Sequence, residues 1–374
     1  MIRPLWIDVD LRLLRNNLKL LQKQLGKKAR IIATVKQSAY GHGLIPVARE
    51  LGTCGIDCFG VASLEEAITL REDGFPGDII ILSSILEKHV DYFVQHNIIP
   101  TVVDIGFAKR LNKAASQKSK VMPIHVKVDT GMGRLGFYHK QAHSFIKKLS
   151  KFSNIYLEGI YTHFPAADSD YDFTNYQIEI FNNFISQLKK ENITFKYQHC
   201  ANSIGIINYP QAHFNMVRPG LILYGIKPTE DINMSVEPIL SLKSKLIFVK
   251  KIEKGMSVGY ARSYISKKSH YIGTVAVGYA DGYPWHLSNK AQVIIDNKLF
   301  DIAGRVCMDH IMVDLGDSEG LRIGKEVILI GKSKQERITA EDLAKKCQTI
   351  PYEIVSRLSP NIPRVYKNSI LKGF

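Results

Sequence analysis

The sequence predicts an α/β fold, with an N-terminal (β/α)8 barrel followed by a C-terminal, mostly-β domain. About eight short apolar runs alternate with helical patterns in the first part of the chain, as in a parallel sheet closed into a barrel. Beyond Pro238 the helical periodicity fades, and short strand-like runs separated by glycine turns take over. A length of 374 residues also favours two domains over one. We therefore expect domains at residues 1–230 and 231–374.

Each barrel strand is expected where a short run of apolar and β-branched residues gives way to polar or glycine-rich sequence. A helix is expected at 10–25, because leucines recur there at spacings of three and four. Ser63 with Glu66 three residues later is a capping-box pattern, which predicts the start of another helix. The expected strands are 31–35, 58–62, 78–82, 100–103, 124–128, 157–162, 197–200 and 214–217.

The C-terminal domain is expected to consist mainly of strands that end at glycine turns. A helix is expected at 340–346, and the sequence Ile350-Pro351-Tyr352-Glu353 after it predicts a turn. The expected strands are 240–249, 271–277, 292–295, 311–313 and 327–330.

The charge balance is basic, with 50 Lys and Arg against 35 Asp and Glu and a net charge of +15. The lysines are spread along the chain without a zinc-finger or aromatic RNA-binding pattern, so we expect no nucleic-acid partner. Five cysteines without metal-site spacing favour reduced thiols and no bound metal. The sequence shows neither a signal peptide nor a run long enough to span a membrane, which favours a cytoplasmic protein.

Lys36 comes directly after the apolar run 31–35 and precedes a polar loop with Tyr40, Gly41 and Gly43. A lysine at the C-terminal end of a buried strand lies where parallel α/β folds place their chemistry. Partial burial there lowers the pKa of the amine, which suits it to covalent bonding with a carbonyl cofactor. The alternative is a lysine that only reaches from the strand end into solvent.

Other polar residues come just after the expected strands and would share one end of the barrel with Lys36. Each has an ordinary structural alternative: His163 as a core histidine, Ser203 as a helix cap and Arg218 as an ion-pair partner. Together they predict a site for a phosphorylated, aromatic, anionic ligand, with backbone amides near the phosphate. The residues gathered there are Lys36, Tyr40, Lys127, Arg134, His163, Asn202, Ser203, Arg218, Pro219 and Gly220.

Longer motifs connect these positions to a known family. They are 35–43 (VKQSAYGHG), 127–136 (KVDTGMGRLG), 217–225 (VRPGLILYG), 278–282 (GYADG), 304–309 (GRVCMD) and 351–353 (PYE). In order and spacing they resemble the motifs of alanine racemases. Gln37-Ser38 stand where that family usually has Ala-Asn. A looser match, 258–264 (VGYARSY), has Gly-Tyr-Ala where Ser-Tyr-Gly is usual.

The resemblance implies an isomerase that uses pyridoxal 5'-phosphate (PLP) to interconvert L-alanine and D-alanine by a two-base mechanism, supplying D-alanine for peptidoglycan. Lys36 would bind PLP and act as one base, and Tyr264 would be the other. Arg218 would face the pyridine nitrogen, oriented by His163. The phosphate would be held by Tyr40, Ser203, Gly220 and Tyr352, and the substrate carboxylate by Arg134 and the backbone of Met308.

The resemblance also implies that Lys127 is carbamylated. An ammonium beside Arg134 would repel the guanidinium, whereas a carbamate would be an anion that orients it. The alternative is a Lys127 side chain that points into solvent. The family further implies a homodimer with shared active sites, in which one chain supplies Lys36 and the other supplies Tyr264 and Met308.

Three rival functions make different demands on the sequence. A PLP-dependent amino-acid decarboxylase of the same fold would place an acidic residue at the pyridine nitrogen, and Arg218 argues against it. A non-enzymatic PLP carrier would need only the barrel, and the second domain with Tyr264 and Met308 argues against that. Nucleic-acid binding rests on the net charge alone.

Overall fold

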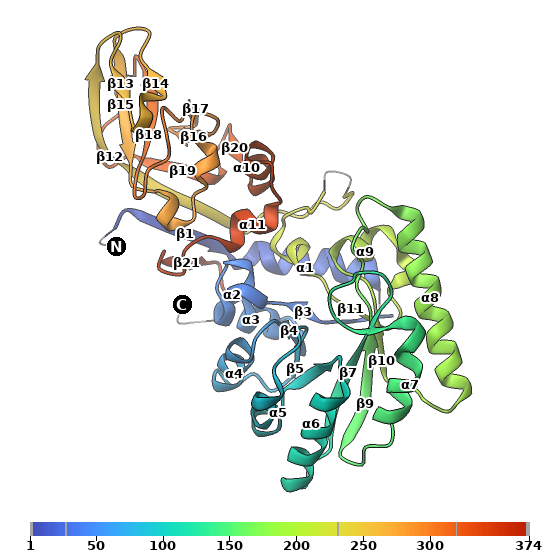
Figure 1. Ribbon diagram of the computed structural model, residues 1–374. Coiled ribbons are helices and arrows are strands. Elements are labelled where there is room, and N and C mark those ends of the chain that lie inside the picture. Colours follow the sequence, from blue (N-terminus) through green and yellow to red (C-terminus); the bar gives the residue numbers. More distant parts are fainter. Residues whose placement is uncertain (1–2, 27, 230–231, 319, 372–374) are drawn as a thin grey trace.

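The computed structural model describes residues 3–26, 28–229, 232–318 and 320–371. Its chain forms two bodies, a barrel with surrounding helices and a β-rich body beside it (Figure 1). The predicted domain boundary between residues 230 and 231 lies outside the described residues. None of the helices within the described ranges is long and apolar enough to cross a membrane.

The first body contains a parallel sheet curled into a barrel, as predicted. Hydrogen bonds join its strands in the order β10-β9-β7-β6-β5-β4-β3, and β11 pairs in parallel with β2. β2 and β3 follow one another in a single apolar run, so the ring of strands continues from β3 through β2 to β11. The strands are β2 (Arg30–Ile31), β3 (Ala33–Thr34), β4 (Cys58–Val61), β5 (Asp78–Ile81), β6 (Ile99–Val102), β7 (Met122–Asp129), β9 (Ile155–Tyr161), β10 (Tyr197–His199) and β11 (Met216–Val217).

Helices between these strands cover the outside of the barrel (Figure 1). In α1 (Leu11–Leu25) the leucines at the predicted spacing are buried, and the Asp10 carboxylate caps the first turn. The other elements are α2 (Lys36–Tyr40), α3 (Leu44–Thr53), α4 (Leu64–Glu72), η1 (Glu87–His89), α5 (Val90–His96), α6 (Ile105–Gln117), β8 (Phe137–Tyr138), α7 (His139–Leu149), α8 (Tyr171–Lys190), α9 (Ser203–Asn208), η2 (Pro210–Ala212) and η3 (Leu221–Tyr224).

The second body is mostly β, which confirms the predicted architecture. Its long strand β12 (Leu240–Ile252) pairs antiparallel with β1 (Leu5–Asp10), β15 (His270–Val275) and β19 (Glu326–Lys332). The remaining elements are β13 (Ser257–Val258), η4 (Tyr260–Arg262), β14 (Tyr264–Ile265), η5 (Tyr279–Asp281), η6 (Trp285–Leu287), β16 (Gln292–Ile295), β17 (Lys298–Asp301), β18 (Ile311–Gly316), β20 (Arg337–Ile338), α10 (Ala340–Cys347), α11 (Pro351–Ser356) and β21 (Arg364–Lys367).

Two segments differ from the sequence-based expectation. The N-terminal strand β1, for which no strand was expected, lies between β12 and β21 in the sheet of the second body. The segment expected to turn at 350–353 instead begins helix α11, with Pro351 at its first position. Proline suits that position because its missing N–H would have no partner within the helix there.

A tight junction joins the barrel to the second body. Gly225 lies directly after η3 with φ of +75°, and a Cβ on it would lie 1.7 Å from the carbonyl oxygen of Glu237. Asn17 of α1 fixes the same place, because its buried amide donates to the carbonyls of Leu223 and Glu237 and accepts from the Glu237 N–H. The approach of these segments therefore requires glycine at position 225.

We expect Gly225→Ala to lower the free energy of unfolding by roughly 3 kcal/mol or more, through left-handed strain plus a backbone clash. The matched control is Gly74→Ala, where φ is +86° but a Cβ would meet nothing within 4 Å. That variant should lose only the strain, about 1–2 kcal/mol. Denaturant unfolding of the two variants measures the difference, and equal losses would contradict the account of the junction.

Candidate active site

Lys36 lies at the barrel end of β3 and begins a turn with unusual backbone geometry. Residues 37–40 all have φ between +52° and +54°, the left-handed region that non-glycine residues rarely occupy. Each such residue costs roughly 1–2 kcal/mol. Backbone hydrogen bonds hold the turn, since Ala39 N–H donates to Val35 O at 2.7 Å and Gly43 N–H to Ser38 O at 2.8 Å. The surrounding structure therefore fixes the backbone just after the lysine.

Glu66 of α4 braces this turn from the neighbouring strand end. One carboxylate oxygen accepts the Ser38 N–H at 3.1 Å, and the other accepts the Ala62 N–H at 3.0 Å. Ser63 caps α4 as predicted, because its hydroxyl accepts the Glu66 N–H at 3.3 Å. The Glu66 side chain thus ties the loop after β3 to the loop after β4.

The Lys36 amine lies in a cationic, partly buried setting. Burial lowers its pKa, and the guanidinium groups of Arg134 and Arg218 lower it further, against the opposing charge of Glu66. The ammonium form is disfavoured because it cannot be fully hydrated and faces two like charges. A lysine in such a setting is a nucleophile and a base at lower pH than an exposed lysine.

Arg218, directly after β11, is held inside the barrel end with only 5% of its surface exposed. One terminal nitrogen donates to His199 Nδ1 at 2.6 Å and to the His199 carbonyl at 3.0 Å. The other donates to the carbonyls of Thr162 at 2.7 Å and Cys200 at 2.9 Å, and lies 3.4 Å from His163 Nδ1. These acceptors compensate for the burial of the charge and fix the plane of the guanidinium.

The Tyr161 ring contacts two buried cations. The Arg218 Cζ lies 5.0 Å and the Lys127 Nζ 5.4 Å from the ring centroid, distances at which the aromatic ring attracts both charges. Lys127 is only 2% exposed, and its pKa is lowered to about 8 by burial, then by Arg218 and Arg134. Lys127 therefore points into the site rather than into solvent, and a large share of its amine is neutral near pH 8.

Hydroxyl groups and a backbone amide converge at the start of α9. Gly220 N–H donates to the Ser203 hydroxyl at 3.0 Å, and a Cβ on Gly220 would lie 2.6 Å from the Tyr40 hydroxyl. Tyr352 of α11 brings a third hydroxyl group to this region, with its ring centroid 6.1 Å from that of Tyr40. The cradle has the donors and the small backbone residue that an anionic phosphate needs.

Comparisons with known proteins agree with this geometry. The family model for the alanine racemase N-terminal domain matches residues 9–228, and the model for the alanine racemase C-terminal domain matches 239–366. The chain belongs to the alanine racemase family. Its activity is therefore that of an amino-acid isomerase acting on alanine, as predicted. The family is PLP-dependent, so the cradle and Lys36 have an expected ligand.

Full-length relatives support this assignment. The alanine racemase of Halothermothrix orenii is 40% identical over 98% of both chains, and that of Carboxydothermus hydrogenoformans 39% identical over 98% of this chain and all of its own. A solved alanine racemase from Bacillus anthracis with bound L-Ala-P superposes with a TM-score of 0.92 at 32% identity, covering 98% and 95% of the two chains. A histidine racemase from Leuconostoc mesenteroides subsp. sake superposes at 0.89 and 28% identity, with 98% of both chains covered, so related racemases differ in substrate.

Two of the residues predicted for the site of this alanine racemase do not belong to the barrel. Tyr264 and Met308 belong to the second body, with Met308 53% exposed. The Tyr264 hydroxyl donates to the Asp314 carboxylate at 2.6 Å and lies 3.1 Å from His270 Nε2. Burial and then Asp314 raise the pKa of Tyr264, so less of it is present as the phenolate that could remove a proton. The Tyr264 hydroxyl is thus bound inside its own domain, and its role as a base stays a prediction.

Two residues that contact Arg218 lie inside barrel strands and were not predicted from the sequence. His199 is the last residue of β10 and Tyr161 the last of β9, whereas predicted residues such as Lys36 and Arg218 lie just beyond the strands. Tyr224 was also missed: its hydroxyl donates to the Thr34 carbonyl at 2.8 Å, and its ring lies 5.3 Å from Tyr40. Residues of this kind could have been found by looking for polar side chains that face inward at the last positions of the strands.

We expect Glu66→Ala to loosen the turn after Lys36, because the Ser38 and Ala62 amides lose a charged acceptor. Native-state hydrogen exchange at these two amides should speed up by about tenfold or more, since a bond to a charged group is worth about 1.5–3 kcal/mol. Glu72→Ala, an exposed glutamate in the last turn of the same helix, is the control and should leave both amides unchanged. Unchanged exchange at Ser38 in Glu66→Ala would contradict the role of Glu66.

Proposed function

We propose that this alanine racemase binds PLP at Lys36 and inverts alanine with two bases, Lys36 and Tyr260, at sites shared between two copies of the chain. The observation that carries the proposal is the Lys36 amine, partly buried between cations at the barrel end that also bears the cradle of Ser203, Gly220 and Tyr40. The supply of D-alanine for peptidoglycan stays a prediction of the resemblance.

The residues present fit the cofactor. Lys36 would be the attachment point, Tyr40, Ser203, Gly220 and Tyr352 would hold the phosphate, and Arg218 would face the pyridine nitrogen. When bound, PLP supplies the electron sink without which the Cα proton of an amino acid is too weakly acidic to be removed at neutral pH.

Arg218 sets the electronic character of the site. A guanidinium is always protonated and only donates, so Arg218 would not transfer a proton to the ring nitrogen of bound PLP. The neighbouring His163 is neutral, because burial and then Arg218 lower its pKa well below the usual value. With Arg218 at this place the electron sink would be weaker than with an acidic residue, which would favour return of the proton to Cα over competing reactions.

Inversion at Cα needs one group to remove the proton from one face and another to deliver a proton to the opposite face. Lys36 serves one face. For the other we propose Tyr260, four residues before Tyr264, because its side chain is 69% exposed and no hydrogen bond of its hydroxyl occurs among the described residues. Tyr260 can therefore enter a site on another molecule, whereas Tyr264 is tied to Asp314.

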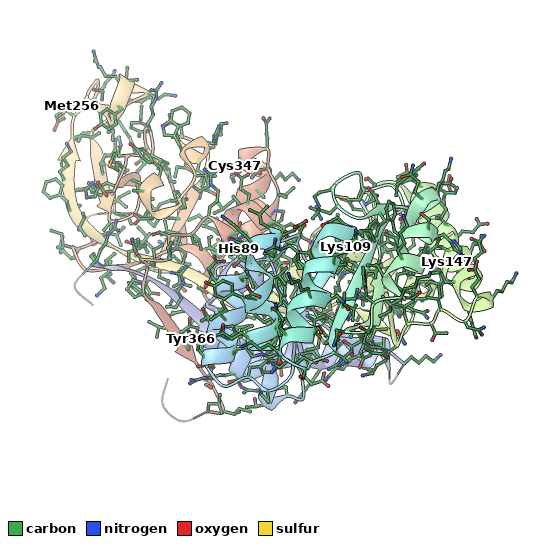
Figure 2. All side chains as sticks on the ribbon, turned by 60° about the horizontal axis from the view of Figure 1, so that its bottom comes forward. His89, Lys109, Lys147, Met256, Cys347 and Tyr366 are labelled. Atoms are coloured by element: carbon green, nitrogen blue, oxygen red, sulfur yellow. The ribbon has the colours of Figure 1, made fainter. Side chains whose placement is uncertain are left out.

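The arrangement of the two bodies supports a shared site. Figure 1 shows β13 and β14, which flank Tyr260, at the far end of the second body, whereas α2 with Lys36 lies at the barrel. In Figure 2, Met256, just before β13, is likewise at the end of the molecule away from Lys109 and Lys147 on the barrel helices. In a homodimer the partner subunit's Tyr260 and Met308 would complete the site, with Arg134 and the Met308 backbone on the substrate carboxylate.

We expect Tyr260→Phe to lose at least about two powers of ten in kcat, because it removes one general base. Tyr264→Phe is the matched control: it removes a hydroxyl bonded to Asp314 and should lower stability while keeping most of kcat. A chiral assay of L-alanine and D-alanine measures both variants. The reverse order of losses would restore Tyr264 as the base.

Mixing two inactive variants tests the shared site. Lys36→Ala and Tyr260→Phe are unfolded and refolded together in equal amounts, so half of the dimers contain one chain of each kind. Each mixed dimer has one site with both bases intact, so we expect roughly a quarter of the parental activity by two-fold symmetry. A mixture as inactive as the separate variants would show that both bases come from one chain.

Lys127 carbamylation is the remaining proposal for the site. Its neutral amine would attack CO₂, form an N–C bond and release a proton, which leaves an anion between Arg218 and Arg134 in place of a third cation. We expect protein equilibrated with ¹³C-labelled CO₂ to show a carbamate ¹³C resonance. Lys127→Met should lose it and Lys109→Met, on the outer surface of α6, should keep it. A spectrum that does not change in Lys127→Met would contradict the modification.

A further inference from the structure

The hydrogen-bonded groups around Arg218 continue into the interior of the barrel. His199 Nδ1 accepts from Arg218, and His199 Nε2 lies 2.8 Å from Nδ1 of His125 on β7. His125 Nε2 in turn faces an oxygen of Glu158 on β9 at 3.8 Å. Both imidazole rings are completely buried and Glu158 is 8% exposed. Four side chains from three strands and a strand end therefore form one line.

The protons in this line have a single consistent arrangement. Arg218 can only donate, so His199 Nδ1 carries a lone pair and the N–H of the neutral ring is on Nε2. His199 then donates to His125 Nδ1, which must also carry a lone pair, so the N–H of His125 is on Nε2. This last N–H points at the Glu158 carboxylate. Within the described residues, neither His125 Nε2 nor the facing Glu158 oxygen has a hydrogen-bond partner, so each remains open to the other, at 3.8 Å.

Two local features place His125 and Glu158 together. The pairing of β7 with β9 shifts register after Ile124 and Leu157, so that His125 pairs with Gly159 and Glu158 is the extra residue of a bulge. A bulge re-aims a side chain that regular pairing would place elsewhere. Gly159 makes room for the imidazole, because a Cβ there would lie 2.5 Å from the His125 ring.

The line ends at the opposite end of the barrel from the catalytic residues. Lys196, just before β10, lies 3.6 Å from the second Glu158 oxygen, and its side chain is 54% exposed. The Glu158 carboxylate thus remains charged, since His125 and Lys196 both lower its pKa although burial raises it. A charged acceptor at this end favours the N–H of His125 on the nitrogen that faces it.

We propose that Glu158 is a positioning residue for Arg218, and acts through the tautomers of His125 and His199. The carboxylate holds the His125 N–H on Nε2, which leaves His125 Nδ1 free to accept from His199 and His199 Nδ1 free to accept from Arg218. Without an acceptor at position 158, His125 can place its N–H on Nδ1. His199 Nε2 would then accept from His125, the N–H of His199 would move to Nδ1, and the acceptor of Arg218 would be lost.

The proton arrangement is tested on the parental protein without cofactor. Its imidazole nitrogens are labelled with ¹⁵N and assigned with His125→Gln and His199→Gln, because ¹⁵N shifts distinguish the two tautomers from the doubly protonated ring. We expect both rings to be neutral with the N–H on Nε2. An N–H on Nδ1 of either ring, or a doubly protonated ring, would overturn the proposal even if no Glu158 variant folds.

The role of Glu158 for Arg218 rests on the proposed function and is tested with two variants. Glu158→Leu removes the acceptor, and we expect a mixture of tautomers at His199 and a kcat reduced roughly tenfold through a misplaced Arg218. Glu158→Gln keeps an acceptor oxygen and should retain the parental tautomers and most of kcat. Parental tautomers and kcat in Glu158→Leu would overturn the proposal while the tests of Lys36 and Tyr260 stand unaffected.

Discussion

The site depends on one buried cation, the Arg218 guanidinium at the end of β11. Burying a charge is costly unless it is fully paired, and here the partners are three backbone carbonyls and two imidazole nitrogens. They belong to Thr162, His163, His199 and Cys200. No carboxylate contacts Arg218 among its hydrogen-bond partners in the described residues. Its positive field is therefore not cancelled locally and reaches the other groups of the barrel end.

That field accounts for much of the acid–base chemistry of the site. Arg218 contributes, with burial and Arg134, to the lowered pKa values of Lys36 and Lys127, and it favours neutral His163 and His199. Burial and the cations Arg134 and Arg218 together thus favour a reactive amine at Lys36, and burial with Arg218 favours lone pairs on the neighbouring imidazoles. The left-handed turn at 37–40, braced by Glu66, keeps that amine at the barrel end where the field acts.

Repeating patterns and strand ends were enough to predict the barrel and the core of the site from the sequence. Apolar runs that alternate with helices indicated the barrel, and the rule that polar residues lie just beyond parallel strands brought Lys36, Arg218 and Ser203 together. Prediction failed where the outcome depends on partners distant in the chain. Tyr264 meets Asp314, fifty residues away, whereas Tyr260 stays exposed, and strand β1 forms because β12 and β21 pair with it. Neither contact can be predicted from the residues next to it in the sequence.

Arg218 lowers the pKa values of the titratable groups around it, and the pKa of Lys127 measures this effect most directly. Protein labelled with ¹³C at lysine Cε is titrated by NMR in a CO₂-free buffer, and the Lys127 resonance is assigned with Lys127→Arg. The parental protein should show a pKa of about 8. In Arg218→Met the cation that lowers the Lys127 pKa most is removed, so the pKa should rise, while burial and Arg134 keep it below the ordinary lysine value of about 10.4. A pKa that stays at the parental value in Arg218→Met would contradict the account.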